Sequence, residues 1–186
     1  MIKVENLCKS FGQKKVLCGV NLEVKDGETL VIIGGSGTGK SILLKNIVGL
    51  IKPDKGSVFI DGIDITKVDK EHIYEVQKKI GFLFQEAALF DSLTIEENIA
   101  FGIKNLTNLT KEETKTRVSQ CLNMVGLSDI EHLKPSALSG GMKKRVGLAR
   151  AIAYRPKYVF YDEPTTGLDP IMSDVIGSLI MYLKKE

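Results

Sequence analysis

The pattern of apolar and polar residues in the first stretch of the chain is β-like. Three strands are predicted there, in IKVENL, VLCGVNLEV and GSVFIDG (residues 2–7, 16–24 and 56–62). Residues 30–33, within TLVIIGG, form a continuous apolar and β-branched run, which is typical of a strand buried on both faces. A helix is expected from Lys40 to about Gly49, because Pro53 follows shortly afterwards.

The second half of the chain is mainly helical between two further strands. Buried strands are predicted in KIGFLFQ and YVFYDE (79–85 and 158–163), and helices at about 139–154 and 169–184. Residues 86–136 also have a helical pattern, in which Thr110 is expected to cap a helix with Glu113 three residues later. The order is therefore a β-rich start, an α/β core and a helical insertion that returns to the core.

Composition narrows the class of protein. The 186 residues are 43% hydrophobic and 26% charged, which is typical of one globular domain with a core that needs no disulfides. The net charge is only +3, so charge gives no reason to expect a nucleic-acid partner. Cys8, Cys18 and Cys121 form no C-x-x-C pair, which favours a reduced, cytosolic compartment. We expect neither a signal peptide nor a transmembrane segment.

A glycine-rich segment, GGSGTGKS, separates the apolar run from the predicted helix. It fits the pattern G-x-x-x-x-G-K-[ST], in which backbone N–H groups surround phosphates because glycines carry no Cβ. Lys40 is expected to reach the terminal phosphates, and the Ser41 hydroxyl to bind Mg²⁺. The alternative is a glycine turn that binds nothing, but the strand before it and the helix after it argue against that. The predicted phosphate-binding residues are Gly34, Gly35, Ser36, Gly37, Thr38, Gly39, Lys40 and Ser41.

An acidic pair follows the strand in YVFYDEP. The carboxyl ends of parallel strands are where α/β folds bind ligands, and this strand ends at Asp162 and Glu163. Asp162 is expected to hold Mg²⁺, directly or through water, and Glu163 to take a proton from an attacking water. Taken alone, an exposed acidic pair with no function is the better interpretation, whereas together with the phosphate loop the pair predicts a catalytic edge.

The segment ALSGGMKKRVGLAR (137–150) has the features of a second anion-binding helix start. Unpaired N–H groups and the positive end of the helix dipole gather at such a start. Lys143 and Lys144 are interpreted as a solvated helix face. The segment raises the question of why one domain needs two phosphate sites.

Five motifs, in the order in which they occur along the chain, suggest an answer to that question. The phosphate loop, Gln85 after a strand, LSGGM, YDEP and GLDP resemble those of the ATP-binding cassette (ABC) ATPases over essentially the whole chain. This resemblance implies an α/β P-loop NTPase fold with an N-terminal antiparallel β-subdomain, a mainly parallel core sheet and an inserted helical subdomain. It implies one domain over 1–186, in which 1–85 and 137–186 form the β-subdomain and nucleotide-binding core and 86–136 the helical subdomain.

Residue roles also follow from the resemblance. Two cassettes sandwich two ATP molecules, so the signature residues contact the γ-phosphate of the ATP held by a second cassette subunit, in a homodimer. The residues in that position are Ser139, Gly140 and Gly141. Gln85 matches the glutamine that senses Mg²⁺ and the attacking water, and Asp169 matches the aspartate at the dimer interface. Phe11 matches the aromatic ring that lies against adenine, although such a phenylalanine taken alone is more often core.

A finer resemblance suggests the cargo. The signature with Met142 in place of the usual glutamine, with its flanking sequences, is similar to that of ATPases of maintenance-of-lipid-asymmetry transporters. It implies phospholipid transport at the cytoplasmic face of the bacterial inner membrane, with an integral-membrane permease and lipid-binding partner proteins. Residues 86–101 are where such a cassette contacts its permease. Importers of ribonucleotides, amino acids or metals are the alternative, followed by non-transport ABC proteins, whose coiled coils or second cassette this sequence lacks.

One family feature has no counterpart in this sequence. The family carries a histidine that contacts the γ-phosphate on a strand after the last helix, whereas His72 and His132 both precede YDEP. We therefore expect a chain truncated at its C-terminal end that binds ATP but hydrolyses it feebly alone. The last helix carries a wide apolar stripe that includes Ile171 and Val175, and we expect part of this stripe to be poorly covered in the truncated chain.

Overall fold

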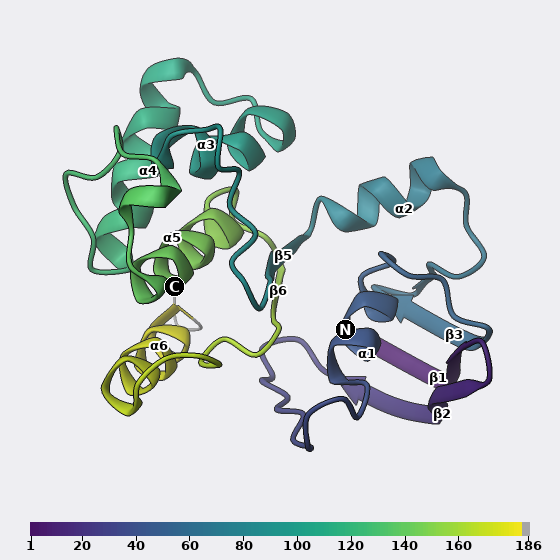
Figure 1. Cartoon of the computed structure of the whole chain (residues 1–186). Coiled ribbons are helices and arrows are strands. Elements are labelled where there is room, and N and C mark those ends of the chain that lie inside the picture. The colour runs from purple at the N-terminus through teal and green to yellow at the C-terminus, as the bar shows by residue number, and fades with distance from the viewer. Residues whose placement is uncertain (184–186) are drawn as a thin grey trace. The chain divides into compact units, whose positions relative to one another are not determined.

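The computed structural model describes residues 1–183, with the backbone alone at Lys70, and divides them into two compact units (Figure 1). The first unit comprises Met1–Lys78, and the second begins at Lys79. Each unit has its own sheet and helices and is described by itself. The single domain with an inserted helical subdomain stays a prediction, and the predicted helix end at Lys184 lies outside the described residues.

An antiparallel sheet forms the centre of the first unit. Its strands are β1 (Ile2–Phe11), β2 (Lys14–Val24), β3 (Lys55–Ile60) and β4 (Ile63–Asp64), in the order β2-β1-β3-β4. All neighbours in this sheet run antiparallel, which confirms the β-rich start. Gly56 is required at the crossing of β3 and β1, because a Cβ there would lie 2.4 Å from the carbonyl oxygen of Glu5. Its φ of +89° also favours glycine.

Two helices complete the first unit. The predicted helix after the glycine-rich segment is α1 (Lys40–Ile47). Helix α2 (Lys70–Gln77) was not anticipated from the sequence, although Asp69 gives the signal for it. The Asp69 side chain accepts a hydrogen bond from the N–H of His72, which satisfies a donor of the first turn.

The apolar run at residues 30–33 is not a strand in the structure, so that prediction is wrong. The segment has no assigned secondary structure, and Val31 and Ile33 are 72% and 91% exposed. A strand forms only where a neighbouring strand accepts its backbone hydrogen bonds, and the sheet of this unit consists of β1 to β4. The apolar composition therefore predicted burial without specifying a partner strand.

Two parallel strands form the sheet of the second unit. They are β5 (Ile80–Leu83) and β6 (Tyr158–Tyr161), which pair in register from Ile80 opposite Tyr158 to Leu83 opposite Tyr161. Both were predicted, and the parallel pairing confirms the α/β class. Because parallel strands end at the same edge, the segments that follow Leu83 and Tyr161 leave the sheet together.

The helices of this unit lie to one side of the strand pair in the view of Figure 1. They are α3 (Ile95–Leu106), α4 (Lys111–Met124), the short 3₁₀ turn Pro135–Ala137, α5 (Gly140–Ile152) and α6 (Pro170–Leu183), and α5 contacts β5. Buried residues of α3, α4 and α5 form one hydrophobic core that also contains Leu83 of β5. The predicted capping box of α4 is confirmed, because Thr110 and Glu113 exchange hydrogen bonds between side chain and backbone. None of the described residues forms a helix long and apolar enough to cross a membrane.

Helix α5 packs closely against β5 at two glycines. A Cβ on Gly81 would lie 2.2 Å from the carbonyl oxygen of Ala151, and one on Gly147 would lie 2.9 Å from Leu83 Cδ1. No side chain fits at either position without a shift of backbone or core. These two glycines therefore fix the helix against the strand whose end carries Gln85.

Helix α6 leaves part of its apolar stripe uncovered, as the sequence predicts. Ile176 is fully buried, whereas Ile171 and Val175 are exposed. Leu179 and Leu183 pack partly against the core of the unit. The expectation that part of this apolar face is poorly covered is therefore confirmed for Ile171 and Val175.

Candidate phosphate-binding and catalytic sites

The phosphate loop leads into α1 through a glycine in a left-handed conformation. Gly39 has a φ of +102° and is buried against Val16. A Cβ at this position would lie 2.8 Å from Val16 Cγ1, so both backbone geometry and space require glycine. The loop before it is exposed from Gly34 to Thr38.

The side chains of the loop fold back on its own backbone. Lys40 Nζ donates to the carbonyl oxygens of Gly34 and Gly35, at 3.0 and 2.8 Å. Thr38 Oγ1 donates to the same Gly35 oxygen at 2.9 Å. These contacts place the ammonium over the centre of the loop, next to the N-terminus of α1. Among the described residues no side chain caps that helix.

Phe11 lies at the end of β1 with its ring half exposed. It faces Lys14 across the β1–β2 turn, and Lys9 Nζ lies 5.6 Å from the ring centroid. The alternative interpretation, that Phe11 is a core residue, does not fit a ring that is half exposed. An exposed aromatic face is available for stacking on a base, so the adenine contact stays a prediction.

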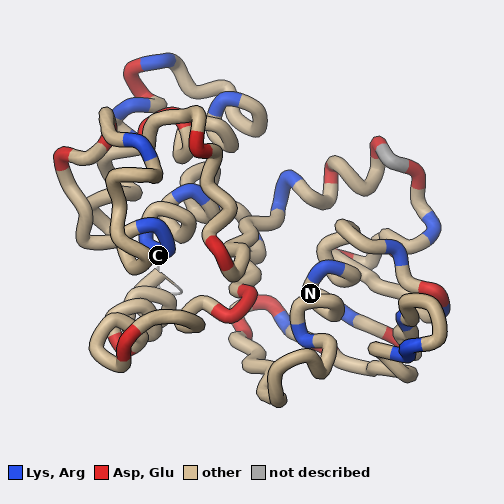
Figure 2. Tube along the Cα trace, viewed as in Figure 1, with Lys and Arg blue, Asp and Glu red and all other residues tan. Residues whose placement is uncertain are grey.

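The second unit carries an acidic sheet edge. Gln85 follows β5 by two residues, and Glu163 follows β6 by the same number, so both leave the sheet at one edge. Asp162 continues the ladder by donating its N–H to the carbonyl oxygen of Leu83 at 2.9 Å, and the residue is only 3% exposed. Figure 2 shows acidic residues on the segments that follow both strands. Asp162 and Glu163 are therefore not the exposed acidic pair of the alternative interpretation.

Glu163 adopts a backbone conformation that is uncommon for a residue with a side chain. Its φ is +48°. One carboxylate oxygen, Oε2, accepts a hydrogen bond from the Thr166 hydroxyl at 3.0 Å. The Glu163 carbonyl accepts one from the Thr166 N–H at 3.2 Å, which closes a turn. Thr166 thus holds both the backbone and the carboxylate of the predicted general base.

The predicted signature lies at the N-terminus of α5. Ser139 is the N-cap, and its Oγ accepts a hydrogen bond from the Met142 N–H at 3.3 Å. Nothing lies within 4 Å of a Cβ built on Gly140, while one on Gly141 would meet Met172 Cε at 3.2 Å. Backbone at Gly140 is therefore open to a ligand from outside the chain.

Lys144 is not on a solvated helix face, so that interpretation is wrong. The residue is only 7% exposed, and its Nζ donates to the carbonyl oxygens of Thr166 and Glu163, at 2.5 and 3.3 Å. Burial lowers the pKa of Lys144, whereas the charges of Glu86 and Glu163 act in the opposite direction. The sequence contained a signal for the burial of Lys144. One face of the helix carries residues 144, 147, 148 and 151, which are all buried.

A second cation on α5 was missed by the sequence analysis. Arg150 donates from Nη2 to the carbonyl oxygen of Ala87 at 2.6 Å and from Nη1 to that of Ala88 at 2.7 Å. Both alanines have positive φ, at +59° and +49°. Burial lowers the pKa of Arg150, and Tyr154 opposes this. Arg150 therefore holds the strained backbone just after Gln85, where a local motif search gives no signal for it.

Asp169 caps the last helix. Its Oδ1 accepts a hydrogen bond from the Met172 N–H at 2.9 Å, and the residue is exposed. The predicted role of Asp169 at a dimer interface stays a prediction.

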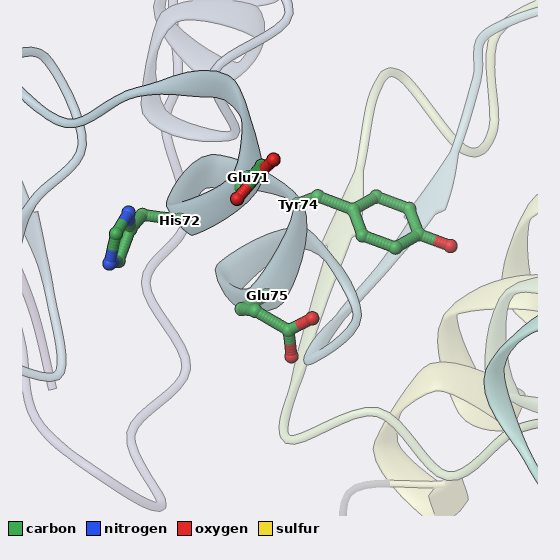
Figure 3. Close-up of a pocket in the computed structure, with 4 residues that line it drawn as sticks. All are labelled: Glu71, His72, Tyr74 and Glu75. Carbon is green, nitrogen blue, oxygen red and sulfur yellow. The ribbon is translucent and has the colours of Figure 1, made fainter.

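A pocket of about 520 Å³ is lined by one helix of the first unit (Figure 3). Its walls are Glu71, His72, Tyr74 and Glu75 of α2. His72 Nδ1 lies 2.7 Å from the Asp69 carboxylate. Hydrogen bonds from the backbone and the ring of His72 lower the pKa of Asp69. Two carboxylates in the wall disfavour a phosphate ligand, and none of the predicted site residues lines this pocket.

The predicted residues thus fall into two groups. The phosphate loop and Phe11 belong to the first unit, and the signature, Gln85, Asp162, Glu163 and Asp169 belong to the second. Within the second unit the structure brings Gln85 and the acidic pair to one sheet edge. It also joins the signature helix to both loops of that edge, through Lys144 and Arg150.

Comparison with protein families gives one extensive match. The model for the family described as ABC transporter matches residues 17–166. The probable ribonucleotide transport ATP-binding protein mkl of Mycobacterium leprae is 42% identical over 185 residues, covering 100% of this chain and 53% of the relative. The intermembrane phospholipid transport system ATP-binding protein MlaF of Haemophilus influenzae is 43% identical over 185 residues, covering 100% of this chain and 70% of the relative. The chain spans about half the length of the mycobacterial relatives it matches.

Solved structures agree with the sequence matches. A dimeric ATP-binding cassette in a post-hydrolysis state, bound to ADP and Pi, superposes with a TM-score of 0.92. It is 36% identical, and the match covers 100% of this chain and 83% of the cassette. The predicted fold class is therefore confirmed.

Proposed function

Because the chain belongs to the ABC transporter family, we propose that it binds and hydrolyses ATP to drive a membrane permease. One observation carries the proposal. Helices α2, α3 and α4 each have at least one glutamate in the first turn, and Asp169 caps α6. Helices α1 and α5 have neither and begin with glycine-bearing segments. Two helix starts are thus left without a carboxylate, and their dipoles favour an external anion.

The residues of the chain supply distinct parts of the proposed chemistry. The N–H groups of the loop bind the phosphates, and Lys40 adds a positive charge near the terminal ones. Glu163, held by Thr166, accepts a proton from the attacking water. The hydroxyl of Ser41, the amide oxygen of Gln85 and the carboxylate of Asp162 are oxygen donors of the type Mg²⁺ prefers. The cation would neutralise charge on the β- and γ-phosphates.

The active unit in this proposal is a dimer of cassettes. The signature helix start would meet the γ-phosphate of the ATP bound to the second subunit, which explains two phosphate-binding segments in one chain. The dimeric cassette with ADP and Pi supports this arrangement. Incubation of the purified chain with Mg-ATP, followed by phosphate release and size-exclusion chromatography, tests it. No ATP binding, or binding without any ATP-dependent dimer, would contradict the proposal.

A rigid aromatic surface is proposed to contact the permease at the cytoplasmic face of a membrane. Phe90 and Phe101 are 46% and 50% exposed, and their ring centroids lie 5.2 Å apart. The buried Asn98 accepts from the Phe90 N–H at 2.8 Å and donates to the carbonyl oxygens of Phe90, Leu93 and Thr94. The ring pair is therefore held in place before binding, as interface anchors usually are.

Replacing Phe101 with glutamate is expected to weaken association with the permease about 30-fold, because a carboxylate cannot be buried against an apolar helix. Co-purification of the membrane subunit with tagged wild-type and Phe101→Glu chains measures this. ATP affinity is expected to be unchanged, and Thr116→Glu on the exposed surface of α4 serves as the charge control. Equal recovery of the permease by both chains would contradict this docking surface.

We propose phospholipid as the cargo, with lipid-binding proteins as further partners. The name of the Haemophilus influenzae relative supports this, and that of the Mycobacterium leprae relative supports a ribonucleotide as the second candidate. The co-purified complex, reconstituted in vesicles, is expected to move labelled phospholipid only when Mg-ATP is present. Movement of a ribonucleotide, amino acid or metal without phospholipid would contradict the lipid assignment.

A further inference from the structure

The buried ammonium of Lys144 holds the loop that carries Glu163. Lys144 Nζ donates to the carbonyl oxygens of Thr166 and Glu163, which are the two ends of the turn. Among the described residues, no salt bridge joins Lys144 to a carboxylate, so these carbonyls are its partners. A buried cation that binds two carbonyls strongly favours the one loop conformation in which both point at it.

That conformation is costly without such a partner. Glu163 has a φ of +48°, where the Cβ of a non-glycine residue is crowded. The Thr166 N–H and hydroxyl bond to the carbonyl and carboxylate of Glu163, so the turn and the direction of the carboxylate are linked. If Lys144 no longer bound the Thr166 carbonyl, the backbone of Glu163 would relax from its positive φ. The Glu163 carboxylate would then lose its fixed direction as well.

We infer that Lys144 is a positioning residue for Glu163: it fixes the turn 163–166 so that the carboxylate stays aimed at the reacting water. The inference rests on the proposed role of Glu163 as general base. It also connects two functions along one helix. Gly140 and Gly141, at the start of α5, are proposed to contact the ATP of the partner subunit, and Lys144, one turn later, holds the base of its own subunit.

The test compares Lys144→Met, which keeps the apolar stem and removes the ammonium, with Lys144→Arg, which keeps a cationic donor. In the complex with the permease, Lys144→Met is expected to lower kcat for ATP hydrolysis by about 10- to 100-fold, because small displacements of a catalytic group have effects of this size. KM and nucleotide affinity are expected to change less than about threefold. Lys144→Arg is expected to recover most of the lost kcat.

A second readout does not depend on hydrolysis. The Thr166 amide donates to the Glu163 carbonyl, so hydrogen exchange reports on the turn itself. In Lys144→Met the 163–166 segment is expected to exchange at least about tenfold faster, with the core of α3 and α4 unchanged. Lys115→Met, an exposed lysine of α4, is the charge control, and Val146→Ala, a buried residue of α5, is the control for general destabilisation.

The outcomes separate this inference from the proposed function. If Glu163→Gln hydrolyses ATP like the wild type, the proposed base is wrong. If Glu163→Gln is inactive but Lys144→Met keeps its kcat and its exchange rates, the positioning role is overturned. The role is also overturned if Lys144→Met and Val146→Ala lose kcat and chain-wide protection from hydrogen exchange to the same extent, and Lys144→Arg restores neither kcat nor protection.

Discussion

Lys40→Ala is expected to lower the affinity for Mg-ATP about 100-fold, which corresponds to ~2.7 kcal/mol. The ammonium lies over the loop through its contacts with the Gly34 and Gly35 carbonyls, so it is held where phosphate oxygens would gather. Its removal loses charge-assisted hydrogen bonds, each worth about 1.5–3 kcal/mol, and leaves phosphate charge uncompensated. Titration calorimetry with a non-hydrolysable ATP analogue measures the change directly.

Lys45→Ala is the matched control, because Lys45 lies in the last turn of the same helix. It removes the same charge at the opposite helix end and is expected to leave the affinity within about twofold. Thermal unfolding of both variants without nucleotide checks that the loop is intact. Equal ATP affinities for wild type and Lys40→Ala would contradict the assignment of the phosphate loop.

The second large effect is expected from Glu163→Gln. The amide keeps the size of the side chain and its contact with the Thr166 hydroxyl, but it accepts no proton from water. In the complex with the permease, turnover is expected to fall about 10³-fold, within the range that general bases contribute. ATP should still bind, and because hydrolysis is what opens the cassette pair, the variant should accumulate as an ATP-bound dimer.

Single-turnover hydrolysis and size-exclusion chromatography with ATP check both parts of this expectation. Glu112→Gln, on the exposed first turn of α4, is the control for the loss of one carboxylate. It is expected to behave like the wild type in both assays. A Glu163→Gln chain that turns over normally, or that forms no more dimer than the wild type, would show that another group acts as the base.

Local chemistry in the sequence predicted the local structure well. Thr110 and Glu113 predicted a capping box because both partners lie within one helical turn. Gly39 was predicted in the phosphate loop, and its φ of +102° explains why glycine is needed there. Motifs of this kind contain their own partners, so periodicity and spacing are enough to recognise them.

Features that depend on distant parts of the chain could not be predicted in the same way. The carbonyls that Lys144 binds lie about twenty residues away, and those of Arg150 about sixty. A cationic run next to a glycine pair therefore suggested a solvated face, although burial and tertiary contacts decide the outcome. The apolar run at residues 30–33 failed for the same reason, since pairing is a property of the whole sheet.

The parallel pairing of β5 and β6 has a consequence for folding during synthesis. Ile80 pairs with Tyr158, so the ladder closes a loop of roughly 80 residues, whereas the β1–β2 turn joins Phe11 to Lys14 directly. At about 5–20 residues per second, β5 is synthesised roughly 4–16 s before its partner. During that interval its four residues, IGFL, have no ladder to join, while the antiparallel sheet already has all of its strands. Chaperone binding to the nascent chain is therefore expected to concentrate between β5 and β6.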